Sequence, residues 1–164
     1  MTDKARDIGE KLRRIGRTIS VAESCTAGGL AHEITRIPGS SAYFLGGIIA
    51  YDNAVKVSHL GVSRNDLERY GAVSAETART MASNCLRRFG SDLAVSITGI
   101  AGPGGGTNEK PVGLVYIGIA DRAGARSHAR RFSGDRASIR AQAVDAALDG
   151  ILELLGEDGA LAAA

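Results

Sequence analysis

Residues 19–29 read Ile-Ser-Val-Ala-Glu-Ser-Cys-Thr-Ala-Gly-Gly, a short β-rich run followed by small hydroxylated residues and then glycine. The pattern predicts a strand that ends before Ser24 and a helix that begins near Thr26. Unpaired N–H groups and the positive dipole end at a helix N-terminus favour anions and developing oxyanions. Ser24 and Thr26 are therefore candidates for a hydrolytic nucleophile or a phosphate site. The alternative is that Ser24 or Thr26 is only an N-cap, which is what Ser and Thr usually are before a helix.

Apolar strands alternate with amphipathic helices along the rest of the chain, which predicts an α/β fold. Strands are expected at 17–22, 43–51, 93–98, 112–120 and 125–132. Helices are expected at 3–15, 26–36, 53–60, 64–70, between Ser74 and Gly90, and from Asp135 to Gly156. The continuous apolar run 43–51 is typical of a buried strand, and the more polar 125–132 of an edge strand.

The length predicts one domain. We expect it to span residues 1–164, with a core at about 5–155 and a disordered tail at 157–164. We expect a three-layer sandwich, in which helices cover both faces of a mixed sheet.

Composition excludes several classes of function. The formal net charge is +2, and no basic stripe is interleaved with aromatic residues, so no nucleic-acid partner is expected. No run approaches the ~20 apolar residues of a membrane span, and no signal peptide is visible, so we expect a cytoplasmic protein without a membrane partner. Cys25 and Cys85 are too few for a disulfide scaffold and too isolated for a zinc site. Cys85 also falls on the apolar face of its helix, which indicates a core residue.

A glycine-rich loop, Gly99-Ile-Ala-Gly-Pro-Gly-Gly-Gly-Thr-Asn108, follows a predicted strand. It matches neither the Walker pattern nor the dinucleotide-binding GxGxxG pattern. Two readings remain open at this point: a nest of backbone N–H groups that binds a phosphate, and a mobile loop.

The candidate general base is a lysine rather than a histidine. His32, His59 and His128 do not form a convincing triad with a serine. Lys56 follows Tyr51 at the exit of an apolar strand, where desolvation could neutralise it for use as a base. The alternative is a solvent-facing lysine on a short helix, and Arg140 has the same alternative as a surface arginine.

Six blocks of this sequence, in order, are similar to the CinA C-terminal domain family of nicotinamide-nucleotide amidohydrolases. They are Val21–Gly29, Gly46–Tyr51 with Lys56, Tyr70–Ala75, Ile97–Gly105, Lys110–Val115, and Phe132–Arg136 with Arg140.

The resemblance implies hydrolysis of the carboxamide of nicotinamide mononucleotide (NMN) to nicotinate mononucleotide and ammonia, in pyridine-nucleotide recycling. It implies Ser24 as nucleophile, Lys56 as base and Tyr51 as a hydrogen-bond partner in proton transfer. It implies that the reaction needs neither a metal nor a cofactor. It further implies a set of residues that bind the substrate. That set is Thr26, Thr98, Gly99, Gly102, Gly104, Gly105 and Arg140.

The resemblance also implies a homo-oligomer, to which the apolar Tyr43–Ile49 region could contribute. Two alternatives stay open. One is a nucleotide-binding or competence- or damage-related regulatory module without turnover. The other is an amidase for a non-nucleotide amide, which would leave Arg140 and the glycine loop without a phosphate to bind.

Overall fold

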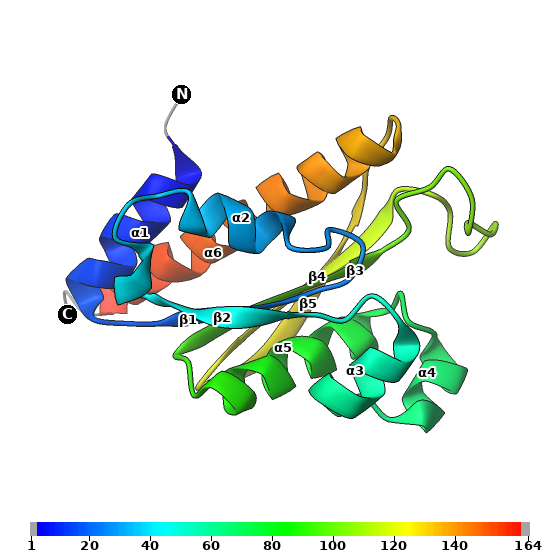
Figure 1. Cartoon of the computed structure of the whole chain (residues 1–164), viewed down its shortest axis with the longest axis horizontal. Coiled ribbons are helices and arrows are strands. Elements are labelled where there is room, and N and C mark those ends of the chain that lie inside the picture. The colour runs from blue at the N-terminus through cyan, green and yellow to red at the C-terminus, as the bar shows by residue number, and fades with distance from the viewer. Residues whose placement is uncertain (1–2, 162–164) are drawn as a thin grey trace.

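The computed structural model describes residues 3–161, and the side chains of 3–156 (Figure 1). Its helices are α1 (Lys4–Ile15), α2 (Gly29–Thr35), α3 (Asn53–Leu60), α4 (Arg64–Tyr70), α5 (Ala75–Phe89) and α6 (Arg136–Leu161), with a short 3₁₀ helix at Ser40–Ala42. Its strands are β1 (Ile19–Glu23), β2 (Phe44–Ile49), β3 (Leu93–Gly99), β4 (Leu114–Asp121) and β5 (Gly124–Arg131).

The five strands form one mixed sheet in the order β2-β1-β3-β4-β5. β1 is parallel to both of its neighbours, β2 and β3, whereas β3–β4 and β4–β5 are antiparallel pairs. The carboxyl ends of β1, β2 and β3 therefore meet at one edge of the sheet, where open α/β sheets bind ligands.

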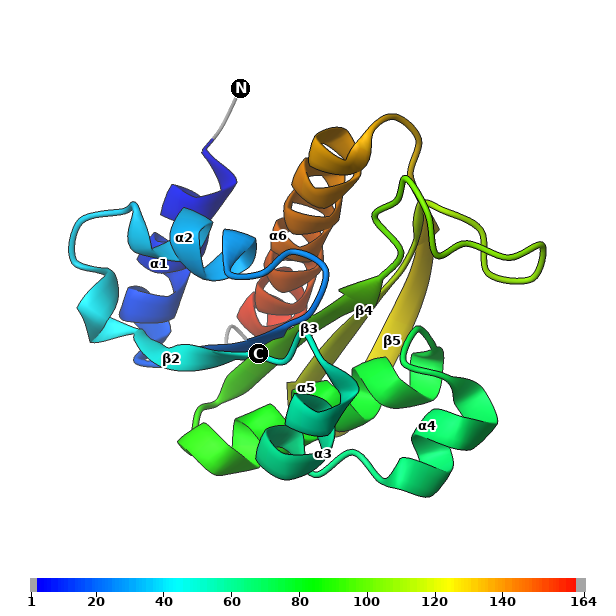
Figure 2. The ribbon, with the colours of Figure 1, turned by 45° about the vertical axis from the view of Figure 1, so that its right-hand side comes forward.

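Helices cover both faces of the sheet, as predicted. α1, α2 and α6 lie on one face and α3, α4 and α5 on the other (Figures 1 and 2). The α/β three-layer architecture is thereby confirmed. No helix within residues 3–161 is both long and apolar enough to cross a membrane.

Capping side chains explain where most helices begin and end. Asp3, Asp52, Ser63 and Ser74 each accept a backbone N–H from the first turn of α1, α3, α4 and α5. Three of these helices end at a glycine in the left-handed conformation, which a residue without Cβ adopts at little cost. The sequence carries these signals locally, and the predicted bounds of α3 and α4 match the structure.

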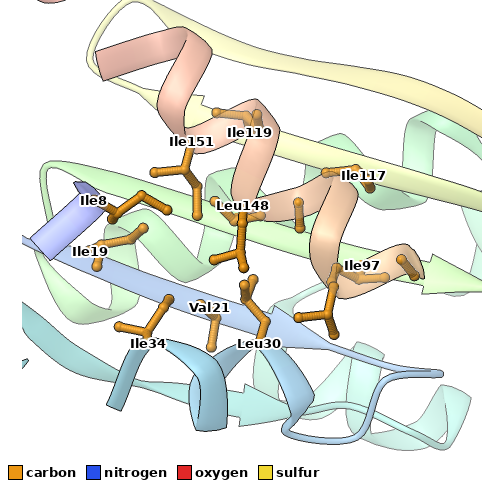
Figure 3. Close-up of a cluster of buried hydrophobic side chains, with 14 of the residues drawn as sticks. Ile8, Ile19, Val21, Leu30, Ile34, Ile97, Ile117, Ile119, Leu148 and Ile151 are labelled. Atoms are coloured by element: carbon orange, nitrogen blue, oxygen red, sulfur yellow. The ribbon is translucent and has the colours of Figure 1, made fainter. Parts of the chain in front are cut away.

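The larger core lies between the sheet and α1, α2 and α6 (Figure 3). Ile8, Leu30, Ile97 and Ile151 come from four different elements and are all fully buried there. A smaller cluster between the sheet and α3 and α5 contains Cys85. Cys85 is fully buried, so the prediction that it is a core residue is confirmed, and this burial raises the pKa of its thiol to about 11.

The expectations for β2 and for the end of α6 were wrong. The apolar run 43–51 forms an edge strand rather than a buried one, and Leu45 and Ile49 on β2 are exposed. Gly156 does not end the last helix: α6 continues to Leu161, although a glycine inside a helix costs about 1 kcal/mol relative to alanine. The predicted tail at 157–164 is therefore helical as far as Leu161, and residues 162–164 lie outside the described part.

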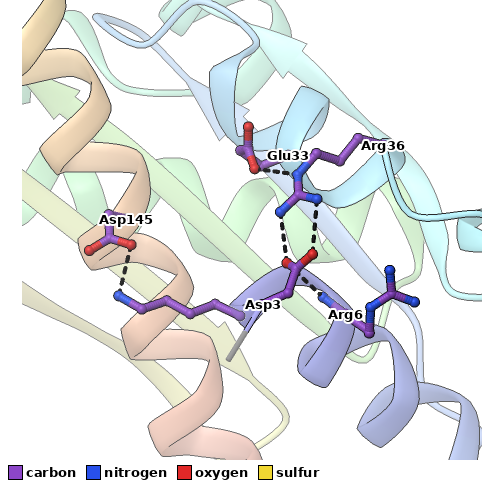
Figure 4. Close-up of polar contacts among 6 residues, drawn as sticks. Asp3, Arg6, Glu33, Arg36 and Asp145 are labelled. Carbon is purple, nitrogen blue, oxygen red and sulfur yellow. Dashed lines mark hydrogen bonds and ion pairs between the residues drawn. The ribbon is translucent and has the colours of Figure 1, made fainter. Parts of the chain in front are cut away.

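Ion pairs join the three helices on the α1 face (Figure 4). Arg36 at the end of α2 donates to both carboxylate oxygens of Asp3, at 2.7 and 3.0 Å, and to Glu33 at 2.6 Å. Lys4 donates to Asp145 on α6 at 2.7 Å. The Arg36 guanidinium lowers the pKa of Asp3. These pairs are partly exposed, so they fix the orientation of the helices more than they add stability.

The packing of α5 on the sheet depends on a glycine. A Cβ at Gly118 of β4 would overlap the Ala78 carbonyl oxygen and the Ser96 hydroxyl. We expect Gly118→Ala to lower the free energy of unfolding by about 1–3 kcal/mol, because the carbonyl belongs to helical backbone and cannot move away. Urea denaturation measures the change. Gly104→Ala is the matched control, because a Cβ there meets no atom within 4 Å; equal losses in both variants would contradict this account.

Candidate functional site

Ser24 and Lys56 are in direct contact at the carboxyl edge of the parallel strands. Ser24 directly follows β1, and Lys56 lies on α3, which follows β2. Lys56 Nζ donates to Ser24 Oγ at 3.1 Å, to the Ala50 carbonyl at 2.8 Å and to the Tyr51 carbonyl at 3.2 Å. A serine hydroxyl within hydrogen-bond distance of a basic side chain is the arrangement of an activated nucleophile.

Lys56 is buried, with only 1% of its surface exposed. Burial lowers the pKa of Lys56, while the nearby Asp52 carboxylate works in the opposite direction. Desolvation therefore favours the neutral amine, which is the form that can accept a proton from Ser24. The alternative of a solvent-facing lysine is wrong.

Cys25 stands next to Ser24 but is poorly suited to be a nucleophile. Burial raises the pKa of its thiol to about 11, so the reactive thiolate is scarce near neutral pH. Of the two adjacent side chains, only Ser24 contacts a base within the described residues.

The loop after Ser24 differs from the prediction. The helix begins at Gly29 rather than near Thr26, and the backbone N–H groups of Gly28, Leu30 and Ala31 donate to the carboxylate of Glu23. Those amides are therefore not available to an oxyanion. The Thr26 hydroxyl also donates to Glu23, at 2.6 Å. Thus Ser24 faces Lys56 and Thr26 faces a carboxylate.

Tyr51 contacts Lys56 through its carbonyl rather than its hydroxyl. The side chain is 57% exposed, and its hydroxyl accepts a hydrogen bond from Arg136 at 2.8 Å. Arg136 also donates to the Gly102 carbonyl at 2.8 Å, so it connects Tyr51 to the glycine-rich loop. Sequence reasoning did not assign a role to Arg136, although it lies in one of the blocks quoted above.

The glycine-rich loop leaves β3 at the same edge of the sheet. Gly102 is buried under the Arg136 contact, whereas Gly104 and Gly105 are exposed. Thr98 is buried near the end of β3, and its hydroxyl donates to the Ala72 carbonyl at 2.7 Å. Its hydroxyl can therefore only accept a further hydrogen bond from a ligand.

Arg140 lies one turn after Arg136 on α6, so the two side chains share a helix face. It donates to the Thr26 carbonyl at 2.8 Å, and its Nε is buried without a partner within the described chain. Arg140 thus supports the loop that carries Ser24.

A cavity of about 420 Å³ lies between α2 and α6, and Thr26, His32, Arg140 and Val144 are among its lining residues. Ser24 and Lys56 are not, so this cavity shares two of the predicted binding residues but not the reactive pair. Among the side chains that the structure describes, those of residues 3–156, no group of three or more His, Cys, Asp or Glu could hold a metal ion.

Comparison with known proteins places these features in a family. Residues 1–155 match the family described as CinA C-terminal domain. A CinA-like protein of Rippkaea orientalis is 57% identical over 145 residues, which is 87% of this chain and 35% of that protein. A CinA-like protein of Gloeothece citriformis is 63% identical over 114 residues, 70% of this chain and 27% of the relative. The chain therefore spans about a third of the length of these curated relatives.

Solved structures agree over nearly the whole chain. The competence/damage inducible protein CihA of Agrobacterium tumefaciens superposes with a TM-score of 0.90 at 42% identity, covering 95% of this chain and 97% of that one. A CinA superfamily protein of Escherichia coli gives 0.89 at 30% identity, with coverages of 92% and 88%. On this similarity of sequence and fold, the chain belongs to the CinA C-terminal domain family.

Proposed function

We propose that the protein hydrolyses the carboxamide of NMN, with Ser24 as nucleophile and Lys56 as general base. The observation that carries this proposal is the contact between Ser24 Oγ and the buried Lys56 Nζ. A binding module has no need to bury a lysine, which is costly, beside a serine hydroxyl. The choice of NMN comes from the family resemblance of the motifs.

The proposed reaction proceeds through an acyl-enzyme. Neutral Lys56 accepts the Ser24 proton while Oγ attacks the carboxamide carbon, and Lys56 then passes that proton to the departing nitrogen, which leaves as ammonia. Water then loses a proton to Lys56 and attacks the ester carbon, the bond to Ser24 Oγ breaks, and Lys56 returns the proton to Oγ, which releases nicotinate mononucleotide and restores Ser24. The reaction needs no oxidant and no second substrate except water.

The oxyanion is assigned to the backbone amides of Cys25 and Thr26. Both follow the nucleophile, and no backbone carbonyl of residues 3–161 and no carboxylate of residues 3–156 accepts a hydrogen bond from either of them. The other backbone amides of this loop already donate within the protein. The Ser24 amide donates to the Ile97 carbonyl, the Ala27 amide to the Ser24 carbonyl, and the Gly28 amide to the Glu23 carboxylate. Fixed amide donors of this kind typically contribute ~10²–10³ in rate.

The phosphate of NMN is assigned to the glycine-rich loop with Arg136 and Arg140, and the proposal keeps Thr98, Gly99, Gly102, Gly104 and Gly105 in the binding site. Arg136 donates to the Gly102 carbonyl of this loop, whose following residues are exposed, and Arg140 lies one turn later on the same face of α6. Guanidinium groups match the geometry of phosphate oxygens. Arg136 joins the exposed Tyr51 hydroxyl to Gly102 of this loop, and the Tyr51 carbonyl contacts Lys56, so Tyr51 connects the loop to the reactive pair.

We expect Arg136→Ala to raise KM for NMN about tenfold or more, because a charge-assisted hydrogen bond contributes about 1.5–3 kcal/mol. The same variant should change KM for nicotinamide riboside, which has no phosphate, much less. Arg88→Ala, an exposed arginine at the end of α5, is the control and should match wild type. An equal rise in KM for both substrates would remove Arg136 from the phosphate site.

The proposed function is tested by ammonia release from purified protein supplied with NMN, nicotinamide riboside or nicotinamide. We expect release from NMN and markedly less from the two compounds without phosphate. Equal release from all three would favour a general amidase. A rise in Tm with NMN, but no ammonia, would favour a nucleotide-binding or regulatory module.

The homo-oligomer also stays a prediction. The exposed Leu45 and Ile49 on the open edge of β2 support it, and light scattering of the purified chain would test it.

A further inference from the structure

Glu23 is a buried acidic residue that the proposed reaction does not use. It is the last residue of β1, directly before Ser24, and only 1% of its surface is exposed. Its Oε2 accepts from Thr26 Oγ1 at 2.6 Å and from the amides of Gly28 and Leu30 at 3.1 Å, and its Oε1 accepts from the Ala31 amide at 2.9 Å. All four partners donate, which is the environment of an ionised carboxylate.

These bonds give α2 its N-terminal cap from a neighbouring strand. The N-cap residue of α2 is Gly28, which has no side chain to cap the helix. Glu23 therefore satisfies amides that Ser, Asp or Asn would normally satisfy. The group that binds the N-terminal amides of α2 is therefore the carboxylate of Glu23 and not a bound ligand.

The same bonds fix the loop that carries the nucleophile. Thr26 and Gly28 are tied to Glu23, and the Ser24 amide is tied to the Ile97 carbonyl of β3 at 2.9 Å. Between these points Ala27 adopts a φ of 49°, which costs free energy for a residue other than glycine and needs support from its surroundings. These hydrogen bonds hold the loop backbone at Ser24 itself and at two positions after it.

We propose that Glu23 is a positioning residue, which holds Ser24 Oγ in reach of Lys56 and keeps the Cys25 and Thr26 amides free of the helix. This inference rests on the proposed function. Glu23 acts through the loop and does not touch the reacting amide. A purely structural role would stabilise the fold without this specific effect on the reaction.

The test is Glu23→Gln, measured for kcat, KM and Tm. The amide keeps one acceptor oxygen but places an N–H₂ group opposite a backbone N–H, so one of the four bonds becomes repulsive. We expect kcat to fall ~10²-fold, as is typical when reacting groups are misplaced by about 1 Å, while KM changes less than threefold. Ser20→Ala is the matched control on the same strand, because it removes a buried hydrogen bond to Ser91 away from the site. It should lower Tm and leave kcat unchanged.

Retention of wild-type kcat by Glu23→Gln overturns the proposal. So do parallel losses of kcat and Tm in both variants, which would show a general structural role. If Glu23→Gln does not fold, Thr26→Val and Thr26→Ser carry the same test. The serine variant keeps the hydroxyl donor to Glu23, so its kcat should clearly exceed that of the valine variant; equal values would overturn the proposal.

A fluorophosphonate probe separates failure of this inference from failure of the proposed function. Ser24 Oγ attacks the phosphorus of the probe, fluoride leaves, and the serine proton passes to Lys56. If the wild type releases no ammonia from NMN, the proposed function fails. The labelling rate of Ser24 then decides: slower labelling of Glu23→Gln than of Ser20→Ala supports a positioning role, and equal rates, including no labelling of either, reject it.

Discussion

Ser24→Ala is expected to lower ammonia release from NMN by at least ~10³-fold, since removal of a nucleophile costs more than removal of one oxyanion donor. The structure gives no substitute at this position. The neighbouring Cys25 thiol is buried, with a pKa of about 11, and the Thr26 hydroxyl is bound to Glu23. The loss should be almost entirely in kcat, because the binding residues are untouched.

The fold should tolerate this change. Ser24 is small, and its backbone bond to Ile97 does not depend on the side chain. Circular dichroism and Tm, with NMN present and absent, are the controls. A Ser24→Ala protein that retains turnover within tenfold of wild type would rule out covalent catalysis by Ser24.

Lys56→Arg and Lys56→Met are expected to lose ~10²–10⁴ in kcat/KM, the usual contribution of a general base. Arginine keeps a positive charge and hydrogen-bond donors but is not deprotonated in proteins, so it separates proton transfer from electrostatic support. Methionine removes both. Comparable losses in the two variants would indicate that the proton-accepting amine is what matters. Near-normal turnover of Lys56→Arg would contradict the role of Lys56 as base.

The pH dependence of wild type gives a second test of Lys56. Activity needs the neutral amine, so kcat/KM should rise with pH, and burial places this rise below the usual lysine range because it lowers the pKa of Lys56. The Asp52 carboxylate raises that pKa. Asp52→Asn should therefore move the rise in kcat/KM to lower pH. Asparagine still caps α3, so the helix should be kept. If the rise in kcat/KM moved to higher pH instead, a group other than Lys56 would control it.

The layers of the fold were predictable because local signals define them. Alternating periodicity and capping residues such as Ser74 act within a few residues of the chain, and the bounds of α3, α4 and α5 follow from them. The position of β2 in the sheet was not predictable in the same way. An apolar run looks the same in a central strand and in an edge strand, and only the strand order shows that Leu45 and Ile49 are exposed.

The reactive pair was predictable in residue type, and its geometry was not. The sequence suggested Ser24 and Lys56, but their contact spans 32 positions and depends on how α3 packs against the sheet edge. The same holds for Arg136, whose partner Tyr51 lies 85 positions away. Glu23 was missed for a different reason. The helix after it begins three residues later than the pattern predicts, and a cap that comes from a preceding strand has no sequence signal next to the helix.

The most direct measurement is product analysis after incubation of the wild-type protein with NMN in water enriched in heavy oxygen. We predict nicotinate mononucleotide and ammonia in equal amounts, with one heavy oxygen atom in each product carboxylate, because water supplies the second carboxylate oxygen when the Ser24 ester is hydrolysed. Release of free nicotinamide with ribose phosphate would place the cleavage at the glycosidic bond. That result, or the absence of any product from folded protein, would contradict the account.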